Sequence, residues 1–275
     1  MEHNPTVTLD AKGGIIPNTA SWINSQDNET SEKGYQANST YGNLPIPTRN
    51  GYSFLGWRGS TLPSEYQEVE YIESTGTQWI NTGIKATNKT MIKAKLYTTN
   101  TGVSKSWFGG SINSSHSFIF QAYGSNRYHY QYGTSGSWPT TNIQDTIVGI
   151  EFDVEYGNGS IKINELKTED LPITSFYDST NLAIFAINGG SYPIDGRVYY
   201  FKIFEDDNLI RNFVPCYRKS DNVIGLYDTI NGVFYTNQGT GTFGKGSNVG
   251  TVITSSTKVI TNEDHTLYAI WKKDE

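Results

Sequence analysis

The 275-residue sequence predicts an all-β protein, and three observations support this prediction. First, 28 glycines, with many Thr, Ser and Asn residues, provide frequent turns. Second, the segments between these turns are rich in Tyr, Phe, Ile, Val and Thr, the residues that half-buried strands prefer. Third, no apolar pattern with a helical period continues far enough to indicate a helix.

The first segment of the chain, residues 5–57, predicts two strands joined by an extended connector. A strand with alternating apolar positions ends at a Gly13-Gly14 turn. Pro45 and Pro47 forbid a helix and hold the connector extended. Asn50-Gly51 is a turn signal before an aromatic strand. The last segment of the chain predicts further short strands at 252–254, 257–261 and 264–271.

These two segments resemble the two halves of one module, the Listeria–Bacteroides repeat, also called the internalin B-repeat. The resemblance covers "VTLDAKGG", "YGNLPIPTRNGYSFLGW" and "VITSSTKVITNEDHTLYAIW", which occur in family order. It implies a small β-grasp-like domain formed by residues 5–58 and 248–272. A long intervening segment then reads as a domain inserted in a surface loop, which proteins tolerate when the ends of the guest domain lie close together.

The inserted segment, residues 61–246, contains many short predicted strands separated by turns, the pattern of a sandwich or barrel. The strand candidates are Thr90–Tyr97, Ser117–Tyr123, Arg127–Tyr132, Thr146–Tyr156, Ser160–Leu166, Leu182–Asn188 and Arg197–Glu205. The motifs "EYIESTGTQWINTGI", "GSIKINEL" and "FVPCYRKSDNVIGLYD" resemble laminin-G and concanavalin A-like jelly rolls of bacterial surface and phage proteins. The predicted fold is therefore a jelly-roll β-sandwich inserted into a β-grasp-like repeat domain. A jelly roll does not fix function, because this fold carries lectins, glycosidases, adhesins and spacers.

Composition excludes several classes of function. The net charge of −6 and the absence of basic runs argue against nucleic-acid binding. No stretch approaches the ~18–20 apolar residues of a membrane span, so we expect no membrane insertion. Cys216 is the single cysteine and is expected to be a buried, inert thiol.

Three carboxylates, Glu151, Asp153 and Glu155, alternate along one predicted strand and therefore share a face. Their spacing resembles the E-x-D-x-E strand of concanavalin-like retaining glycosidases, in which one acid is the nucleophile and another the proton donor. The alternative is a solvent-facing strand without chemistry. We favour this alternative, because the residues after Glu155 depart from the glycosidase pattern and a charged strand face is commonly just solvated.

A second candidate site lies around residues 123–138. Tyr128, Tyr130 and Tyr132 share one face of a predicted strand, and Arg127, His129 and Gln131 share the other. Aromatic rings beside amide and guanidinium donors are suited to binding sugars or proteins. The predicted ligand-binding residues are Tyr123, Arg127, Tyr128, His129 and Trp138. The alternative is that the tyrosines pack into the core.

No metal site or cofactor is expected, since the four histidines are scattered and no zinc spacing is present. Asp206-Asp207-Asn208 and Asp178 could contribute oxygen ligands to Ca²⁺, but no spaced ligand series follows, and we favour a hairpin turn.

The sequence thus predicts a non-catalytic adhesion or interaction module that binds a glycan or a host or cell-surface protein. We expect it to be a secreted, extracellular monomer within a longer protein of the bacterial cell surface or a phage virion. Two alternatives remain open. One is a concanavalin-like glycoside hydrolase using Glu151 and Glu155. The other is a passive structural spacer or virion decoration.

Overall fold

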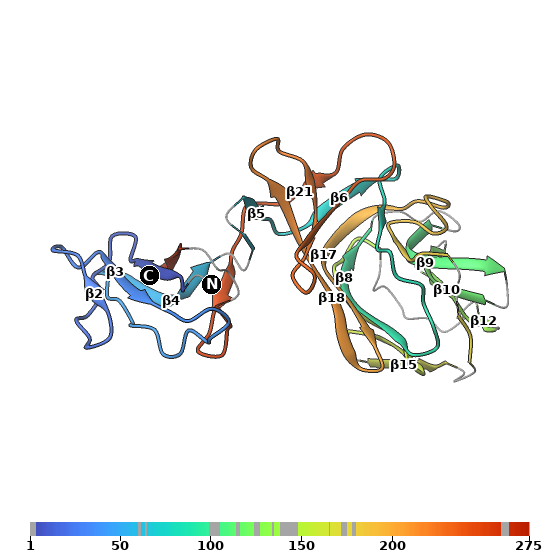
Figure 1. Ribbon diagram of the computed structural model, residues 1–275. Helices are drawn as coiled ribbons and strands as arrows, with labels where there is room; N and C mark the ends of the chain where they lie inside the picture. Colours follow the sequence, from blue (N-terminus) through green and yellow to red (C-terminus); the bar gives the residue numbers. More distant parts are fainter. Residues whose placement is uncertain are drawn as a thin grey trace. The chain divides into compact units, whose positions relative to one another are not determined.

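The computed structural model describes residues 4–59, 62–63, 65–98, 105–113, 116–123, 127–133, 135–137, 148–164, 166–171, 175–177, 180–259 and 264–274. These residues form β-strands and no helix (Figure 1), which confirms the predicted all-β class. Accordingly, they include no helix with the length and apolarity needed to cross a membrane.

The chain divides into two compact units. Unit 1 consists of Met1–Glu68 and Asn248–Glu275, and unit 2 consists of Val69–Ser247. Figure 1 shows the blue N-terminal segment and the red C-terminal segment together in unit 1. Each unit has a hydrophobic core of its own.

Unit 1 is built on one mixed sheet, with the strand order β2-β3-β1-β23-β4-β22. Its central strands β1 and β23 are parallel, while β4 lies antiparallel to both β23 and β22. The strands are β1 (Thr6–Asp10), β2 (Ile23–Asn24), β3 (Thr30–Gly34), β4 (Tyr52–Gly59), β22 (Thr251–Ile253) and β23 (His265–Lys273). The short strand β5 (Tyr66–Glu68) ends the first segment of this unit.

The core of unit 1 draws side chains from both segments of the chain. Leu9 and Trp57 from the first segment are buried with Leu267 from the last. The Trp57 indole N–H also donates to the Pro45 carbonyl at 2.8 Å, so the proline-containing connector is held against the sheet. Neither segment can complete this core alone, because β23 lies between β1 and β4.

The chain leaves unit 1 and returns to it at adjacent points. The Val249 amide donates to the Glu68 carbonyl at 3.0 Å. At the ends of unit 2, the Glu70 amide donates to the Ser247 carbonyl at 2.9 Å. The two compact units divide between Glu68 and Val69, whereas the sequence suggested that the first segment of the repeat ends at residue 58 and the inserted domain begins at residue 61.

Unit 2 contains two sheets. The smaller sheet has the order β12-β11-β10-β9-β16-β7, and the larger one follows the path β15-β14-β13-β8-β17-β18-β19-β20. At one side of the larger sheet, β6 pairs with both β17 and β21. The smaller sheet consists of β7 (Ile80–Asn81), β9 (Lys105–Asn113), β10 (His116–Tyr123), β11 (Arg127–Gly133), β12 (Ser135–Ser137) and β16 (Ala183–Ile184). The strands of the larger sheet that lie within unit 2 are β6 (Ile72–Thr75), β8 (Thr90–Tyr97), β13 (Phe152–Gly157), β14 (Ser160–Ile163), β15 (Leu166–Asp170), β17 (Asp195–Glu205), β18 (Asn208–Arg218), β19 (Ile224–Asp228), β20 (Val233–Thr236) and β21 (Gly244–Lys245).

The two sheets of unit 2 pack face to face as a β-sandwich. Aromatic rings of the smaller sheet meet rings of the larger one between them: the ring centroids of Phe108 and Phe201 are 5.4 Å apart, and those of Phe118 and Tyr156 are 4.7 Å apart. The Tyr156 hydroxyl, fully inside the sandwich, donates to the Gln131 carbonyl across the sheets at 2.6 Å. Buried aromatic side chains thus form much of the hydrophobic core of unit 2.

The strands of the structure differ in places from those expected. The expected strand Leu182–Asn188 is reduced to β16, because Phe185 and Asn188 have positive φ angles of 68° and 47° and turn the chain. The expected strand at 257–261 contains only an isolated bridge from Lys258 to Thr40 among the residues described there. Conversely, the polar segment 17–40 contains β2 and β3, although its sequence has no alternating apolar pattern that would predict a strand.

Candidate functional site

The tyrosines of β11 lie in the core of unit 2. Tyr128 is 2% exposed and its ring centroid lies 5.5 Å from that of Phe120. Tyr130 and Tyr132 are also buried, and both pack near Tyr156 of the larger sheet. The shared face expected for these rings is present, but it points towards the other sheet, so Tyr128 offers no exposed platform to a ligand.

The opposite face of the smaller sheet carries a polar row. His129 of β11 is paired with Gln121 of β10, which is paired with Ser106 of β9. His129 Nδ1 lies 3.1 Å from Gln121 Oε1, and Gln121 Nε2 donates to the Ser106 hydroxyl at 2.8 Å. All three residues are buried, and burial lowers the pKa of His129 to about 4. His129 is therefore a neutral, internally bonded group.

The remaining residues of this predicted site are placed only in part. Tyr123 is half-buried, and its ring centroid lies 6.3 Å from that of His129. Arg127 pairs with Tyr123 through the backbones of β11 and β10. Trp138 lies outside the described residues. The structure thus brings Tyr123 and His129 together, with Tyr128 on the far side of the sheet.

The carboxylates of the candidate glycosidase strand lie on the outer face of the larger sheet, and lysines pair with two of them. Lys93 Nζ lies 3.0 Å from one carboxylate oxygen of Glu155, and Lys162 Nζ lies 3.5 Å from the other. Lys95 forms an ion pair with Glu151. Asp153 instead accepts a hydrogen bond of 2.7 Å from the Tyr200 hydroxyl.

These partners keep the two glutamates ionised. Hydrogen bonds from Lys95 and then Tyr199 lower the pKa of Glu151. Burial raises the pKa of Glu155, but Lys93 and Lys162 outweigh this effect, and its pKa is lowered overall. A glycosidase proton donor needs the opposite shift, a raised pKa that keeps the acid protonated near neutrality. The ion pairs of Glu151 and Glu155 therefore stabilise both side chains in their charged form, which does not suit a proton donor.

Beside these ion pairs, a group of tyrosines surrounds Arg197. The Arg197 guanidinium carbon lies 4.3 Å from the ring centroid of Tyr71 and 4.8 Å from that of Tyr97. Its Nε donates to Glu73 at 2.8 Å, a bond that raises the pKa of Arg197. The rings of Tyr71 and Tyr199 meet edge to face, with centroids 5.3 Å apart. We call this surface the tyrosine face, defined by Tyr71, Glu73, Lys93, Lys95, Tyr97, Glu151, Asp153, Glu155, Lys162, Arg197, Tyr199 and Tyr200.

A β-bulge in β17 adds one aromatic side chain to this face. The pairing of β17 with β8 shifts between Val198 and Tyr200, so Tyr199 is the extra residue. Val198 is buried, whereas Tyr199 and Tyr200 are both partly exposed and both bond to carboxylates of the face. Strict alternation would place one of these tyrosines inside. Sequence reasoning therefore missed this group, whose members come from separate strands without a local motif.

The oxygen-rich turn considered for calcium joins β17 to β18. Asp206 and Asp207 have positive φ angles of 48° and 62°, which form the tight hairpin turn. Asp206 pairs with Lys89, and Asp207 accepts a hydrogen bond from Asn158. Asp178 falls outside the described residues. Across the described part of the chain, no three His, Cys, Asp or Glu side chains gather closely enough to hold a metal ion.

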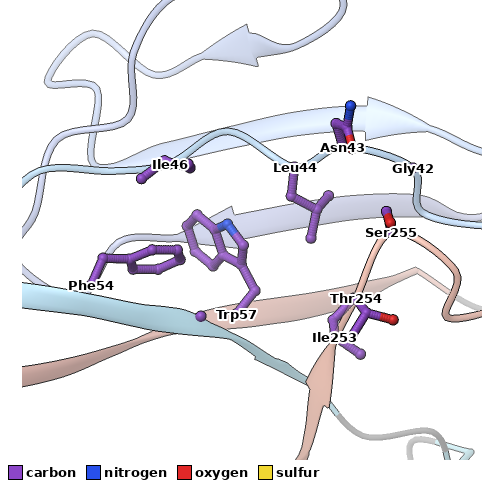
Figure 2. A pocket seen from close by; sticks show the side chains of 10 residues that line it. Gly42, Asn43, Leu44, Ile46, Phe54, Trp57, Ile253, Thr254 and Ser255 are labelled. Carbon is purple, nitrogen blue, oxygen red and sulfur yellow. The ribbon is translucent and has the colours of Figure 1, made fainter.

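Unit 1 has a hollow of about 440 Å³ between its extended connector and the sheet. Figure 2 shows Trp57 of β4 between Leu44 of the connector and Phe54 of β4, with Ile253 at the end of β22. Asn43, Thr254 and Ser255 give its lining a polar part, and the lining contains no ionisable side chain. Its chemistry is limited to apolar contacts and weak hydrogen bonds.

Comparison with known proteins bears on unit 1. Residues 6–95 match the Listeria-Bacteroides repeat domain. Repeats of this family occur in bacterial surface proteins. No curated protein matches the chain.

The matched range and the structural unit overlap without coinciding. Residues 6–68 of the match lie in unit 1, whereas 69–95 form the first strands of the β-sandwich. The strands β22 and β23 lie beyond the match, yet they complete the sheet of unit 1. In unit 1, therefore, the strands that begin the sheet and fall within the match are separated from the strands that complete it by the whole of unit 2.

Proposed function

We propose that the chain is an extracellular interaction module of a bacterial surface protein, in which unit 2 binds a glycan or a protein through the tyrosine face. The repeat in unit 1 supports the surface location. The observation that carries the binding role is the clustering of Tyr71, Tyr97 and Tyr199 around Arg197 on the outer side of a sheet. Tyrosine and arginine are the residues that most often anchor binding surfaces.

We assign Glu151 and Glu155 a positioning role rather than a catalytic one. Both carboxylates are held by lysines that keep them ionised. Their role is to fix Lys93, Lys95 and Tyr199 in one geometry before a partner arrives, which reduces the entropy lost on binding.

The test is a screen of the purified chain on arrays of glycans and of extracellular proteins. We expect saturable binding to at least one spotted molecule, weakened at least tenfold by Tyr199→Ala, because truncation removes the ring that contacts Tyr71 and the hydroxyl that bonds Glu151. Tyr177→Ala is the matched control, since Tyr177 is 65% exposed and lies outside the tyrosine face.

Circular dichroism of both variants establishes that they remain folded. An absence of saturable binding on both arrays would contradict the proposal and leave a passive spacer as the better description. Binding that Tyr199→Ala and Tyr177→Ala weaken equally would place the site elsewhere.

A further inference from the structure

We propose that the ligand of the tyrosine face is an uncharged glycan chain. This inference rests on the proposed function and specifies the chemical class of ligand. Three properties of the face carry it: the compensation of its charges, the accessibility of its polar atoms, and the fixed orientation of its rings.

The charges of the face balance: its four carboxylates, Asp153 included, stand against four cations, and most of them lie in ion pairs. Glu73 pairs with Arg197, and Glu151 pairs with Lys95. Glu155 lies between Lys93 and Lys162. An anionic ligand would meet a carboxylate beside every cation, and a cationic ligand would meet a cation beside each of the three glutamates. The face therefore gives neither sign of charge a net electrostatic advantage.

A hydroxyl group fits this pattern, because it both donates and accepts. It can donate to a carboxylate oxygen and accept from the neighbouring ammonium or guanidinium group without separating the ion pair. The atoms are accessible: the side chains of Glu151 and Lys95 are 42% and 34% exposed, and that of Arg197 is 30% exposed. A chain of sugar hydroxyls can thus bond along the face.

The tyrosines supply the apolar part of sugar recognition. Tyr71 and Tyr97 are both partly exposed, and Arg197 lies over each ring. Because Arg197 is itself held by Glu73, its contacts with both rings restrain them before a ligand binds. Fixed rings can pack against the C–H faces of a sugar at little entropic cost.

The test is affinity electrophoresis of the full chain in gels that contain one polysaccharide each. The neutral probes are laminarin, mannan, galactomannan and dextran, and the anionic probes are hyaluronan and heparan sulfate. We expect retardation by at least one neutral probe, changing less than about twofold between 50 and 500 mM NaCl, because screening acts on net charges. Arg197→Lys and Tyr199→Ala should each weaken it at least tenfold, and Tyr177→Ala should leave it unchanged.

The other outcomes separate this inference from the proposed function. Retardation by anionic probes alone, falling as salt rises, would overturn the inference in favour of an anionic glycan. Binding to an arrayed protein through Tyr199, without retardation by any polysaccharide, would overturn the inference and leave the proposed function standing. An absence of binding in both experiments would remove the two together.

Discussion

His129 carries an imidazole that burial keeps neutral, with its pKa lowered to about 4. It faces away from the core between the sheets and is still only 4% exposed. In the unfolded chain its pKa returns to about 6.5. Between these two values the unfolded state binds a proton that the folded state excludes, so His129 lowers stability as the pH falls from about 6.5 towards 4.

This difference predicts an acid-sensitive stability that a single substitution relieves. Lowering the pH from 7.5 to 5 should reduce the unfolding free energy of unit 2 by about 2 kcal/mol through His129. His129→Gln, which retains a hydrogen-bonding side chain beside Gln121, should reduce this loss. Urea unfolding followed by tryptophan fluorescence measures it, and an equal pH dependence in both proteins would show that His129 does not titrate as described.

At the scale of strands, the junction of β13 with β8 depends on one glycine. Gly157 has a φ of +114°, and a Cβ atom there would lie 2.1 Å from the Thr90 carbonyl oxygen. A side chain at this position would strain the backbone and also push β8 away from β13.

Gly157→Ala should therefore lower the unfolding free energy of unit 2 by about 3 kcal/mol, combining the left-handed strain with overpacking. Gly83→Ala is the control, because Gly83 also has a positive φ of +73° but open space around it. We expect the control to lose only about 1 kcal/mol. Equal losses in chemical denaturation would show that the contact with Thr90 has no effect.

The sequence predicted those features of the strands that depend on neighbouring residues, and it could not predict those that depend on packing between distant strands. Alternation placed Asp153 and Glu155 on one face and Phe152, Val154 and Tyr156 on the other, as the burial of β13 shows. Alternation also grouped Tyr128 with Tyr130 and Tyr132, but only packing against a distant sheet decides which face is buried. The bulge at Tyr199 breaks the pattern itself, and Tyr71, Tyr97 and Arg197 meet through pairings between strands far apart in the chain. The tyrosine face therefore had no signal in any short stretch of sequence.

At the scale of the whole molecule, the two chain segments that connect the units are hydrogen-bonded to each other within each unit. Glu68 and Val249 are hydrogen-bonded in unit 1, and Glu70 and Ser247 are hydrogen-bonded in unit 2. The cores of the two units share no residue. These features allow either unit to be separated without removing any of its own core.

We expect two shortened proteins to fold independently. One joins Glu68 to Asn248 through two glycines and retains unit 1, and the other consists of residues 69–247. Each should give a cooperative thermal transition and a strand-type circular dichroism spectrum. As a control, residues 1–68 alone should not fold, because they lack Leu267 and the strand between β1 and β4. A folded 1–68 fragment, or an unfolded joined protein, would contradict this division.

The parallel pairing of β1 with β23 determines how the molecule carries a mechanical load. Tension applied at Pro5 and Lys273 pulls these neighbouring strands in opposite directions along their length, so their hydrogen bonds resist together in shear. Along the chain, the residues of the β-sandwich are inserted between Glu68 and Asn248, both inside unit 1. While β1 and β23 hold, we expect the pulling force to pass across unit 1 without loading the sandwich, so that the tyrosine face keeps its geometry in a stretched protein.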